Sequence, residues 1–414
     1  AAMYGVLRRI SRQTFAFLTT CLLVISPFHI RISRDARMYG LLALWTLLST
    51  FIFAINLDRF RSPRRFSLVE SVRRSLCRST SAPGLGHSAL VMWGLFWLVT
   101  GLGVFTHYFM VLVIAAQSLF LLLSWRRYAP LLFHWAVIHV VLIATLVFWA
   151  GFSPGLSATL LSVWRRGLVS TVDGKGFLSA LNGLYLGTTL RPNLLRLSLP
   201  LIITALGLVP LRSRASRCSS KQRRCRLLVG LLLAVPGVAL LAIPERITGR
   251  YLTTALPASI FAMSAGLCGL SAFLRRRLSG FADSGLGVVI SYFPSAVLLS
   301  LLLFVNINGY SDVYHPSGES FRAKVEYLHG HAEPEDAVLL HGPWQQLLLS
   351  YYDVGSLETY TISLRDLRVD PDRFDETLTR ILAAHERVWV SYDSVEPVDP
   401  NRVVAQWLHE HAHH

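Results

Sequence analysis

The chain has 414 residues, of which 53% are hydrophobic, and its mean hydropathy of +0.47 is too high for a water-soluble protein of this length. Its net charge of +16 would suit a protein that binds nucleic acid. The basic residues, however, gather in the connections between long apolar runs, which argues against nucleic acid as a partner and indicates a membrane protein.

Nine apolar runs approach or exceed the length needed to cross about 30 Å of hydrocarbon. They lie at 14–30, 38–57, 88–105, 107–125, 131–151, 194–211, 227–243, 251–273 and 287–306. The sequence therefore predicts an α-helical, polytopic membrane domain over residues 1–306.

The distribution of charge orients this domain. If residues 1–13 face the cytoplasm, 22 Lys and Arg fall on that side and 10 fall in the opposite connections before residue 307. Cytoplasmic connections carry such an excess of basic residues. Residues 307–414 hold 18 acidic and 8 basic residues and no spanning run, so we expect them to form an external domain.

This orientation can be tested with a cysteine in place of Ser317. An impermeant thiol reagent should label the Ser317→Cys protein in intact cells, because the residue is predicted to lie outside. The measurement is the labelled fraction before and after lysis. Labelling that appears only after lysis would reverse the orientation of every connection.

The external connection at 152–193 and the external domain carry further local patterns. Residues 160–169 combine Trp and Arg as in a helix lying at the interface, either as a lid over a lipid-borne substrate or as an anchor, and 173–176 predict a turn. In the external domain, helical patterns at 321–328 and 374–384 alternate with strands at 337–340, 360–362 and 388–391. This order predicts a small α/β domain of βαβ type.

Asp35 is one of six acidic residues before position 307, and it lies among three arginines between two apolar runs. A carboxylate at a membrane boundary needs a reason. One interpretation is structural, with Ser33 capping a helix and Asp35 in its first turn. The other is functional, since Arg31, Asp35 and Tyr39 have the spacing of one helix face and an acid there could position a metal, a phosphate or a sugar hydroxyl.

Two more polar groups map to the same predicted boundary. His107 and Tyr108 occupy a tight connection between two spans. The alternative to a functional role is that these aromatic residues form a turn in the aromatic belt at the membrane interface. Arg246, Arg250 and Tyr251 separate two later spans, and arginines suit bidentate contacts with phosphate. The alternative for these arginines is snorkelling to lipid headgroups.

The run from Ile25 to Tyr39, with Ser26-Pro27 followed by Asp35-Ala36-Arg37 and Tyr39, resembles the second external loop of bacterial GT-C glycosyltransferases. These include the protein O-mannosyltransferases and the lipid A aminoarabinose transferase. The segments 106–109 and 249–252, with Pro257 following, resemble two further family segments, and an acidic domain after the last span also fits the bacterial members.

The resemblance implies a multi-pass enzyme of the bacterial inner membrane that transfers a hexosyl or pentosyl group with inversion on the external face. The donor would be a polyprenyl-phosphate sugar, and the acceptor a glycan, a lipid or a protein. Asp35 is expected as a supporting catalytic residue, with a divalent metal as a further role. The expected donor-binding residues are Arg34, Arg37, Tyr39, His107, Tyr108, Arg246, Arg250 and Tyr251.

The family's principal catalytic aspartate lies in a first external loop that has no counterpart in these 414 residues. The expectation is therefore that the sequence is incomplete at its N-terminus and lacks that loop. Two other classes stay open. A transporter or flippase of lipid-linked saccharides would share the topology, although transporters usually place ionisable groups in mid-membrane or in repeated halves. A membrane scaffold would leave the clustered boundary residues unexplained.

Overall fold

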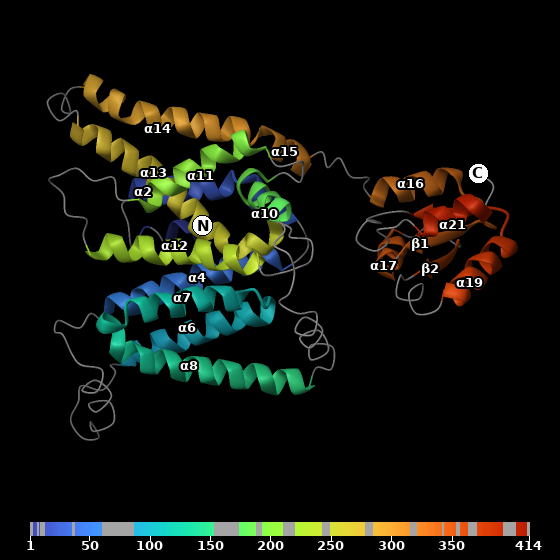
Figure 1. The fold of residues 1–414 in the computed structure, drawn as a ribbon, viewed down its shortest axis with the longest axis horizontal. Coiled ribbons are helices and arrows are strands. Elements are labelled where there is room, and N and C mark those ends of the chain that lie inside the picture. Colours follow the sequence, from blue (N-terminus) through green and yellow to red (C-terminus); the bar gives the residue numbers. More distant parts are fainter. Residues whose placement is uncertain are drawn as a thin grey trace. The chain divides into compact units, whose positions relative to one another are not determined.

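The computed structural model of the protein divides into two compact units, residues 1–315 and residues 316–414. Figure 1 shows a bundle of helices in the first unit and a small sheet flanked by helices in the second. The structure describes residues 3–5, 8, 13–34, 38–59, 87–152, 174–187, 193–209, 220–241, 249–277, 285–314, 321–341, 343–352, 357–362, 371–391 and 403–411.

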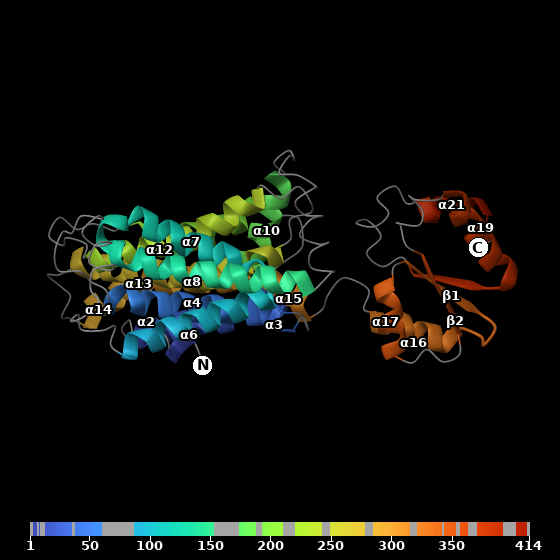
Figure 2. The ribbon, with the colours of Figure 1, turned by 90° about the horizontal axis from the view of Figure 1, so that it is seen from below.

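The described part of the first unit consists of helices. They are α2 (Gln13–Val24), α3 (Pro27–Arg34), α4 (Tyr39–Arg59), α6 (His87–Thr106), α7 (Met110–Leu123), α8 (Trp125–Phe152), α10 (Gly174–Leu186), α11 (Leu194–Leu208), α12 (Ser220–Leu241), the 3₁₀ helix η1 (Gly249–Ala255), α13 (Leu256–Arg277), α14 (Gly285–Val305) and α15 (Ile307–Tyr314). Neighbours in space include α4 and α6, α7 and α12, α11 and α13, and α13 and α14 (Figures 1 and 2). Helix α15, which follows the last predicted span, packs on α3 and belongs to this unit.

Helices form at all nine predicted spans, but they differ in length. Four are long and apolar enough to cross a membrane within the described residues, at Tyr39–Asp58, Gln222–Leu241, Leu252–Arg277 and Leu286–Val305. A fifth span results if the bent pair α2 and α3 counts as one. The other helices of the unit include shorter apolar stretches of 10–17 residues, at Val91–Thr106, Met110–Leu123, Leu131–Thr145, Gly176–Leu186 and Leu194–Leu208.

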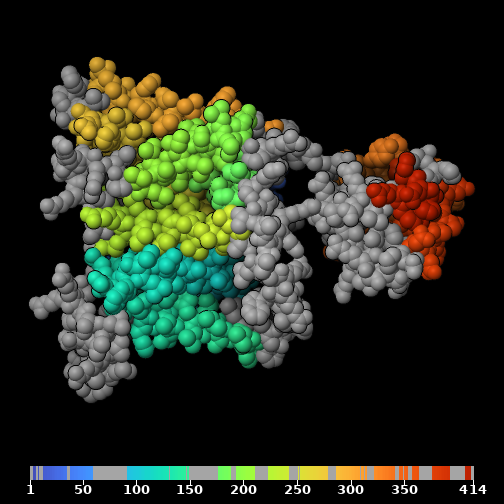
Figure 3. Space-filling view, in the orientation of Figure 1, coloured from blue at the N-terminus to red at the C-terminus, as the bar shows by residue number. Residues whose placement is uncertain are grey.

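Large apolar side chains cover the outward surfaces of α14 and α8, which form opposite margins of the unit in Figure 3. Phe293 and Phe304 of α14 and Val147 and Phe148 of α8 are each more than 60% exposed. Contiguous apolar surface of this kind is unfavourable in water and neutral in lipid. These two margins therefore suit contact with the hydrocarbon of a bilayer.

The predicted span 14–30 is broken, since α2 and α3 are bent by 58°. The cause is local: Pro27 occupies the first position of α3, and the Ser26 hydroxyl accepts the His29 backbone N–H at 3.3 Å. The expectation that Ser33 caps a helix containing Asp35 is wrong, because Ser33 lies inside α3 and α4 begins only at Tyr39. Arg31 and Tyr39 accordingly belong to two helices and share no continuous helix face.

A line of polar contacts joins α4, α6 and α7 inside the first unit. The Ser49 hydroxyl lies 3.0 Å from that of Thr100, and the Gln117 side-chain amide donates to Ser49 at 3.3 Å. All three side chains are buried. Trp45 extends the line by donating to Thr106 at 3.0 Å. Hydrogen bonds between helices hold them together where hydrophobic burial contributes little.

Helices α11 and α13 approach so closely that only glycine fits at two positions. A Cβ atom on Gly207 would lie 1.9 Å from the Ala262 carbonyl oxygen, and one on Gly266 would lie 2.2 Å from the Ile203 carbonyl oxygen. Both neighbours are backbone atoms, which cannot rotate away. Small residues at helix interfaces allow this kind of backbone contact in membrane bundles.

The second unit is an α/β sandwich around a three-stranded parallel sheet. Its strands β1 (Ala337–His341), β2 (Glu358–Ile362) and β3 (Val388–Ser391) lie in the order β2-β1-β3, which confirms the predicted strands and the βαβ arrangement. Val338 and Leu340 pack with α16 (Phe321–His331) and α17 (Pro343–Tyr351) on one face. Leu339 packs with α19 (Pro371–Ala384) and α21 (Val403–His411) on the other.

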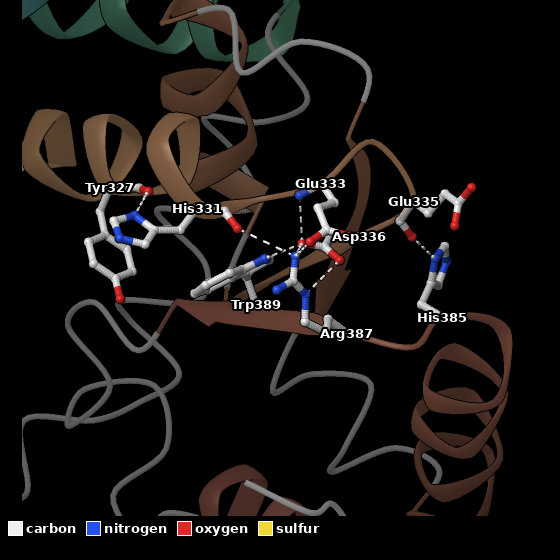
Figure 4. A network of polar contacts seen from close by, with 8 residues as sticks. All are labelled: Tyr327, His331, Glu333, Glu335, Asp336, His385, Arg387 and Trp389. Carbon is white, nitrogen blue, oxygen red and sulfur yellow. Dashed lines mark hydrogen bonds and ion pairs between the residues drawn. The ribbon is translucent and has the colours of Figure 1, made fainter.

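Asp336, directly before β1, is the centre of a polar network (Figure 4). Its side chain is 5% exposed and accepts hydrogen bonds from the Arg387 guanidinium at 2.9 and 3.1 Å, from the Trp389 indole at 2.9 Å and from the Glu333 backbone N–H at 2.9 Å. The Arg387 bonds, and then those from Trp389 and Glu333, lower the pKa of Asp336 from 3.8 to about 2 despite burial. The network joins the starts of β1 and β3.

Candidate functional site

The segments predicted to form the site meet at one end of the first unit. The helix η1, which contains Arg250, packs against α4, which starts at Tyr39, and against α7, which starts directly after the 107–109 connection. Helices α10 and α12 also contact η1, and α10 contacts α3. Three segments that are far apart in the sequence therefore share one region.

Tyr39 and His107 are in direct contact within this region. Their ring centroids lie 5.3 Å apart at an interplanar angle of 41°, and the two side chains are only 7% and 6% exposed. Tyr39 is the first residue of α4, and His107 is the first residue after α6. The structure thus joins two of the predicted motifs through a buried pair of rings.

The ring of His107 is oriented by its own connection. Its Nδ1 accepts the backbone N–H of Phe109 at 3.1 Å, so in the neutral ring Nε2 carries the proton and is the donor. Tyr108 packs against His107 at 4.5 Å between centroids and is 57% exposed. The connection therefore presents one buried imidazole and one exposed phenol.

A close approach of three helices holds this connection in place. A Cβ atom on Gly103 would lie 2.9 Å from the Met110 Cγ and 3.2 Å from the Trp45 Cβ. Glycine therefore lets the end of α6 close upon α7 and α4. The Trp45 hydrogen bond to Thr106 secures the same point.

Two arginines of α3 are engaged within the protein. Arg34 donates to the Val313 carbonyl at 2.6 Å and lies 5.2 Å from the centroid of the Tyr314 ring, so it ties α3 to α15. Arg31 donates to the Gly187 carbonyl at 3.4 Å. A guanidinium has five N–H donors, so the bond to Val313 does not use all the donors of Arg34. The contacts that the structure shows for Arg34, however, join α3 to α15.

The end of α10 is pressed against the start of α3 and against α15. Gly187 has φ of +69° and its N–H bonds the Gly183 carbonyl, which ends α10 in the left-handed conformation. A Cβ atom on Gly187 would lie 2.4 Å from the Pro27 Cβ, and one on Gly309 would lie 1.9 Å from the Leu186 carbonyl oxygen. These glycines fix the wall of the region formed by α3, α10 and α15.

Arg250 is half-buried in the first turn of η1, and its carbonyl accepts the Thr253 hydroxyl at 2.6 Å. Leu252, Thr253 and Thr254 after it are fully buried. The Thr254 hydroxyl has no hydrogen-bond partner among the described residues. The 3₁₀ segment then continues directly into α13, whose second residue is Pro257.

Several predicted site residues lie outside the described residues, namely Asp35, Arg37 and Arg246, and the side chain of Tyr251 does so as well. The predicted interfacial helix at 160–169 is also outside them. Within the described ranges, no group of three or more His, Cys, Asp or Glu is placed to hold a metal ion. The proposed metal role of Asp35 stays a prediction.

Helix α10 was missed in the sequence, where residues 152–193 read as an external connection. The turn predicted at 173–176 is wrong from Gly174 onward, because those residues begin α10. Asn182 and Tyr185 of this helix are buried, and the helix packs against η1. A usable signal exists in the helical spacing of Phe177, Leu181 and Leu184.

Comparisons with known proteins leave this region to be interpreted from its own residues. A scan of protein-family models and a search of curated proteins each found no match for the sequence.

Proposed function

We propose that the protein is an integral-membrane glycosyltransferase of GT-C type that uses a polyprenyl-phosphate sugar as donor. The observation that carries this proposal is the buried contact between Tyr39 and His107, beside η1 with Arg250. This region brings together the segments 25–39, 106–109 and 249–252, which resemble parts of such enzymes. A donor of this kind has an acidic phosphate at the membrane surface and a sugar above it, and both need polar partners at one end of the bundle.

Each residue has a role that its chemistry supports. The Arg250 guanidinium offers a planar pair of N–H donors to the donor phosphate. The Nδ1 of His107 accepts the Phe109 N–H, so the donor of the neutral ring is Nε2–H, which would contact a phosphate oxygen or a sugar hydroxyl. Exposed Tyr108 offers a ring face to the sugar. Asp35 supplies the carboxylate, as a supporting catalytic group or a metal ligand.

The proposed location is the bacterial inner membrane, with residues 307–414 outside. The charge asymmetry of the connections supports this orientation. The site then lies at the external surface, where a lipid-linked sugar is available to an extracytoplasmic acceptor.

A transporter of lipid-linked saccharides is the second candidate. In the four described spans, the apolar 18-residue windows each hold no more than two charged residues. Transporters commonly bind their substrates near the middle of the membrane with ionisable groups on broken helices. The gathering of the polar residues at the end of the bundle favours the transferase.

The binding of a photoreactive polyprenyl-phosphate sugar tests the proposal. Arg250→Lys keeps the charge but loses the two-pronged geometry, so we expect about tenfold weaker crosslinking to the donor. The same substitution at Arg196, an exposed residue in the first turn of α11, is the control and should leave binding unchanged. Crosslinking is measured by mass spectrometry as a function of donor concentration.

His107→Asn adds a test of the ring itself. The Asn side-chain oxygen can accept the Phe109 N–H as Nδ1 does, while the Nε2–H is lost. We expect weaker donor binding and only a small fall in melting temperature, because the ring contact with Tyr39 is lost while the Phe109 hydrogen bond is kept. Equal donor binding by wild type, Arg250→Lys and His107→Asn would overturn the assignment of this site.

A further inference from the structure

A polar hollow lies in another part of the first unit, where α7 ends and α8 and α12 begin. Its volume is about 670 Å³, and its described lining consists of Leu123, Ser124, Trp125, Arg126, Arg127, Arg223 and Arg224. Four of these seven residues are arginines, and none is acidic. The chain thus gathers four positive charges around one space.

The backbone adds to this positive field. Trp125 begins α8, which is kinked at Tyr128, so that its long part starts directly after Arg126 and Arg127; Ser220 begins α12, which has 22 residues. The arginines on both helices lie within about one turn of those starts. Helix N-termini carry partial positive charge and favour anions. The two helix starts therefore add to the positive potential that the four guanidinium groups create in the hollow.

The rim of the hollow is apolar. Leu122 and Leu123 at the end of α7 are 59% and 61% exposed, and Trp125 is 42% exposed. The Arg126 guanidinium lies 5.7 Å from the centroid of the Trp125 ring. Tryptophan and arginine in this combination are typical of the lipid headgroup region.

We propose that this hollow is a binding site for a phosphate-bearing anion, supplied by the headgroup of an acidic phospholipid whose acyl chains lie along Leu122 and Leu123. Four like charges around one space repel each other, and a ligand with one or two phosphates relieves that repulsion while accepting paired N–H bonds from the guanidinium forks. Basic pockets between membrane helices bind such headgroups. The site is separate from the proposed sugar-transfer site and shares no named residue with it.

A charge-matched pair of variants tests the proposal. One carries Arg126→Gln, Arg127→Gln and Arg223→Gln; the control carries Gln at Arg275, Arg276 and Arg277, which are exposed in the last turn of α13 and are not among the lining residues. Both lose three positive charges. Binding of cardiolipin is titrated on the detergent-purified full chain by native mass spectrometry, and melting temperatures verify folding.

We expect the pocket variant to bind cardiolipin about 10- to 100-fold more weakly than wild type, and the control variant to stay within about twofold. Inorganic pyrophosphate forms the second arm. If pyrophosphate binds and cardiolipin does not, with the same dependence on the pocket arginines, the phosphate site stands and its source is a soluble ligand. Equal weakening in both variants, or no weakening in the pocket variant, overturns the proposal.

Discussion

Replacing Asp336 by alanine is expected to destabilise the 316–414 unit by about 3–4 kcal/mol, because three donor groups then lose a buried acceptor. Arg387, Trp389 and the Glu333 N–H all converge on this one carboxylate. The measurement is hydrogen exchange of peptides covering β1 and β3 in the full chain. A unit with a three-stranded sheet has little stability to lose.

A surface ion pair in the same unit provides the control. Arg322 and Glu326 lie 2.8 Å apart in α16, but their side chains are 72% and 62% exposed. Glu326→Gln should change the same exchange by less than about 0.5 kcal/mol. Similar protection in the Asp336→Ala and Glu326→Gln proteins would show that the Asp336 network contributes little.

The same network predicts a dependence on pH. The folded pKa of Asp336, about 2, lies below its ordinary value of 3.8, so the carboxylate form is favoured by folding. The resulting stabilisation is fully present above about pH 5 and is lost as the pH falls toward 2. Because Arg387 is half exposed and screened by solvent, we expect a loss of about 1–2 kcal/mol. Asp336→Asn should remove this dependence.

Placing valine at position 266 is expected to prevent the correct packing of α11 on α13. Even a single Cβ atom there would lie 2.2 Å from the Ile203 carbonyl oxygen, so the two backbones would have to separate. We expect a cost of more than about 3 kcal/mol and a chain that elutes as aggregate after detergent extraction. Size-exclusion chromatography and thermal melting measure the effect.

Gly230 in α12 offers a matched control, since a Cβ atom there meets nothing within 4 Å among the described residues. Gly230→Val should extract and melt like wild type. If Gly266→Val does the same, the close approach of α11 and α13 does not determine the fold.

The extent to which the sequence predicts this structure follows from the strength of each local signal. The apolar spans were predictable because lipid imposes a long, uniform run of side chains, and the three strands because β-branched and aromatic residues stand between helical patterns. The break between α2 and α3 has a local signal in Ser26-Pro27, which the apolar run concealed. Helix α10 was hidden in a long connection, although its apolar residues keep helical spacing.

The candidate site depends on contacts that no local pattern contains. Tyr39 and His107 are 68 positions apart in the printed sequence, and only the packing of α4 with α6 and α7 brings their rings together. Arg34 read as a ligand-binding residue because it lies beside an acid. Its partner, the carbonyl of Val313, is 279 residues away and could not be inferred from spacing.

The polar contacts between α4, α6 and α7 fix how far these helices are shifted along one another, and so keep the residues of the candidate site at the same level. Ser49 lies ten residues after Tyr39, about 15 Å along α4, and Gln117 lies seven residues after Met110, the first residue of α7, or about 10 Å along that helix. Lipid allows apolar helices to slide along one another, but a slip of one turn, about 5.4 Å, would break the Ser49 hydrogen bonds with no water to replace them. The same slip would part the rings of Tyr39 and His107. The hydrogen bonds among Ser49, Thr100 and Gln117 therefore fix the positions of the helices along their axes, and with them the geometry of the candidate site at the end of the bundle.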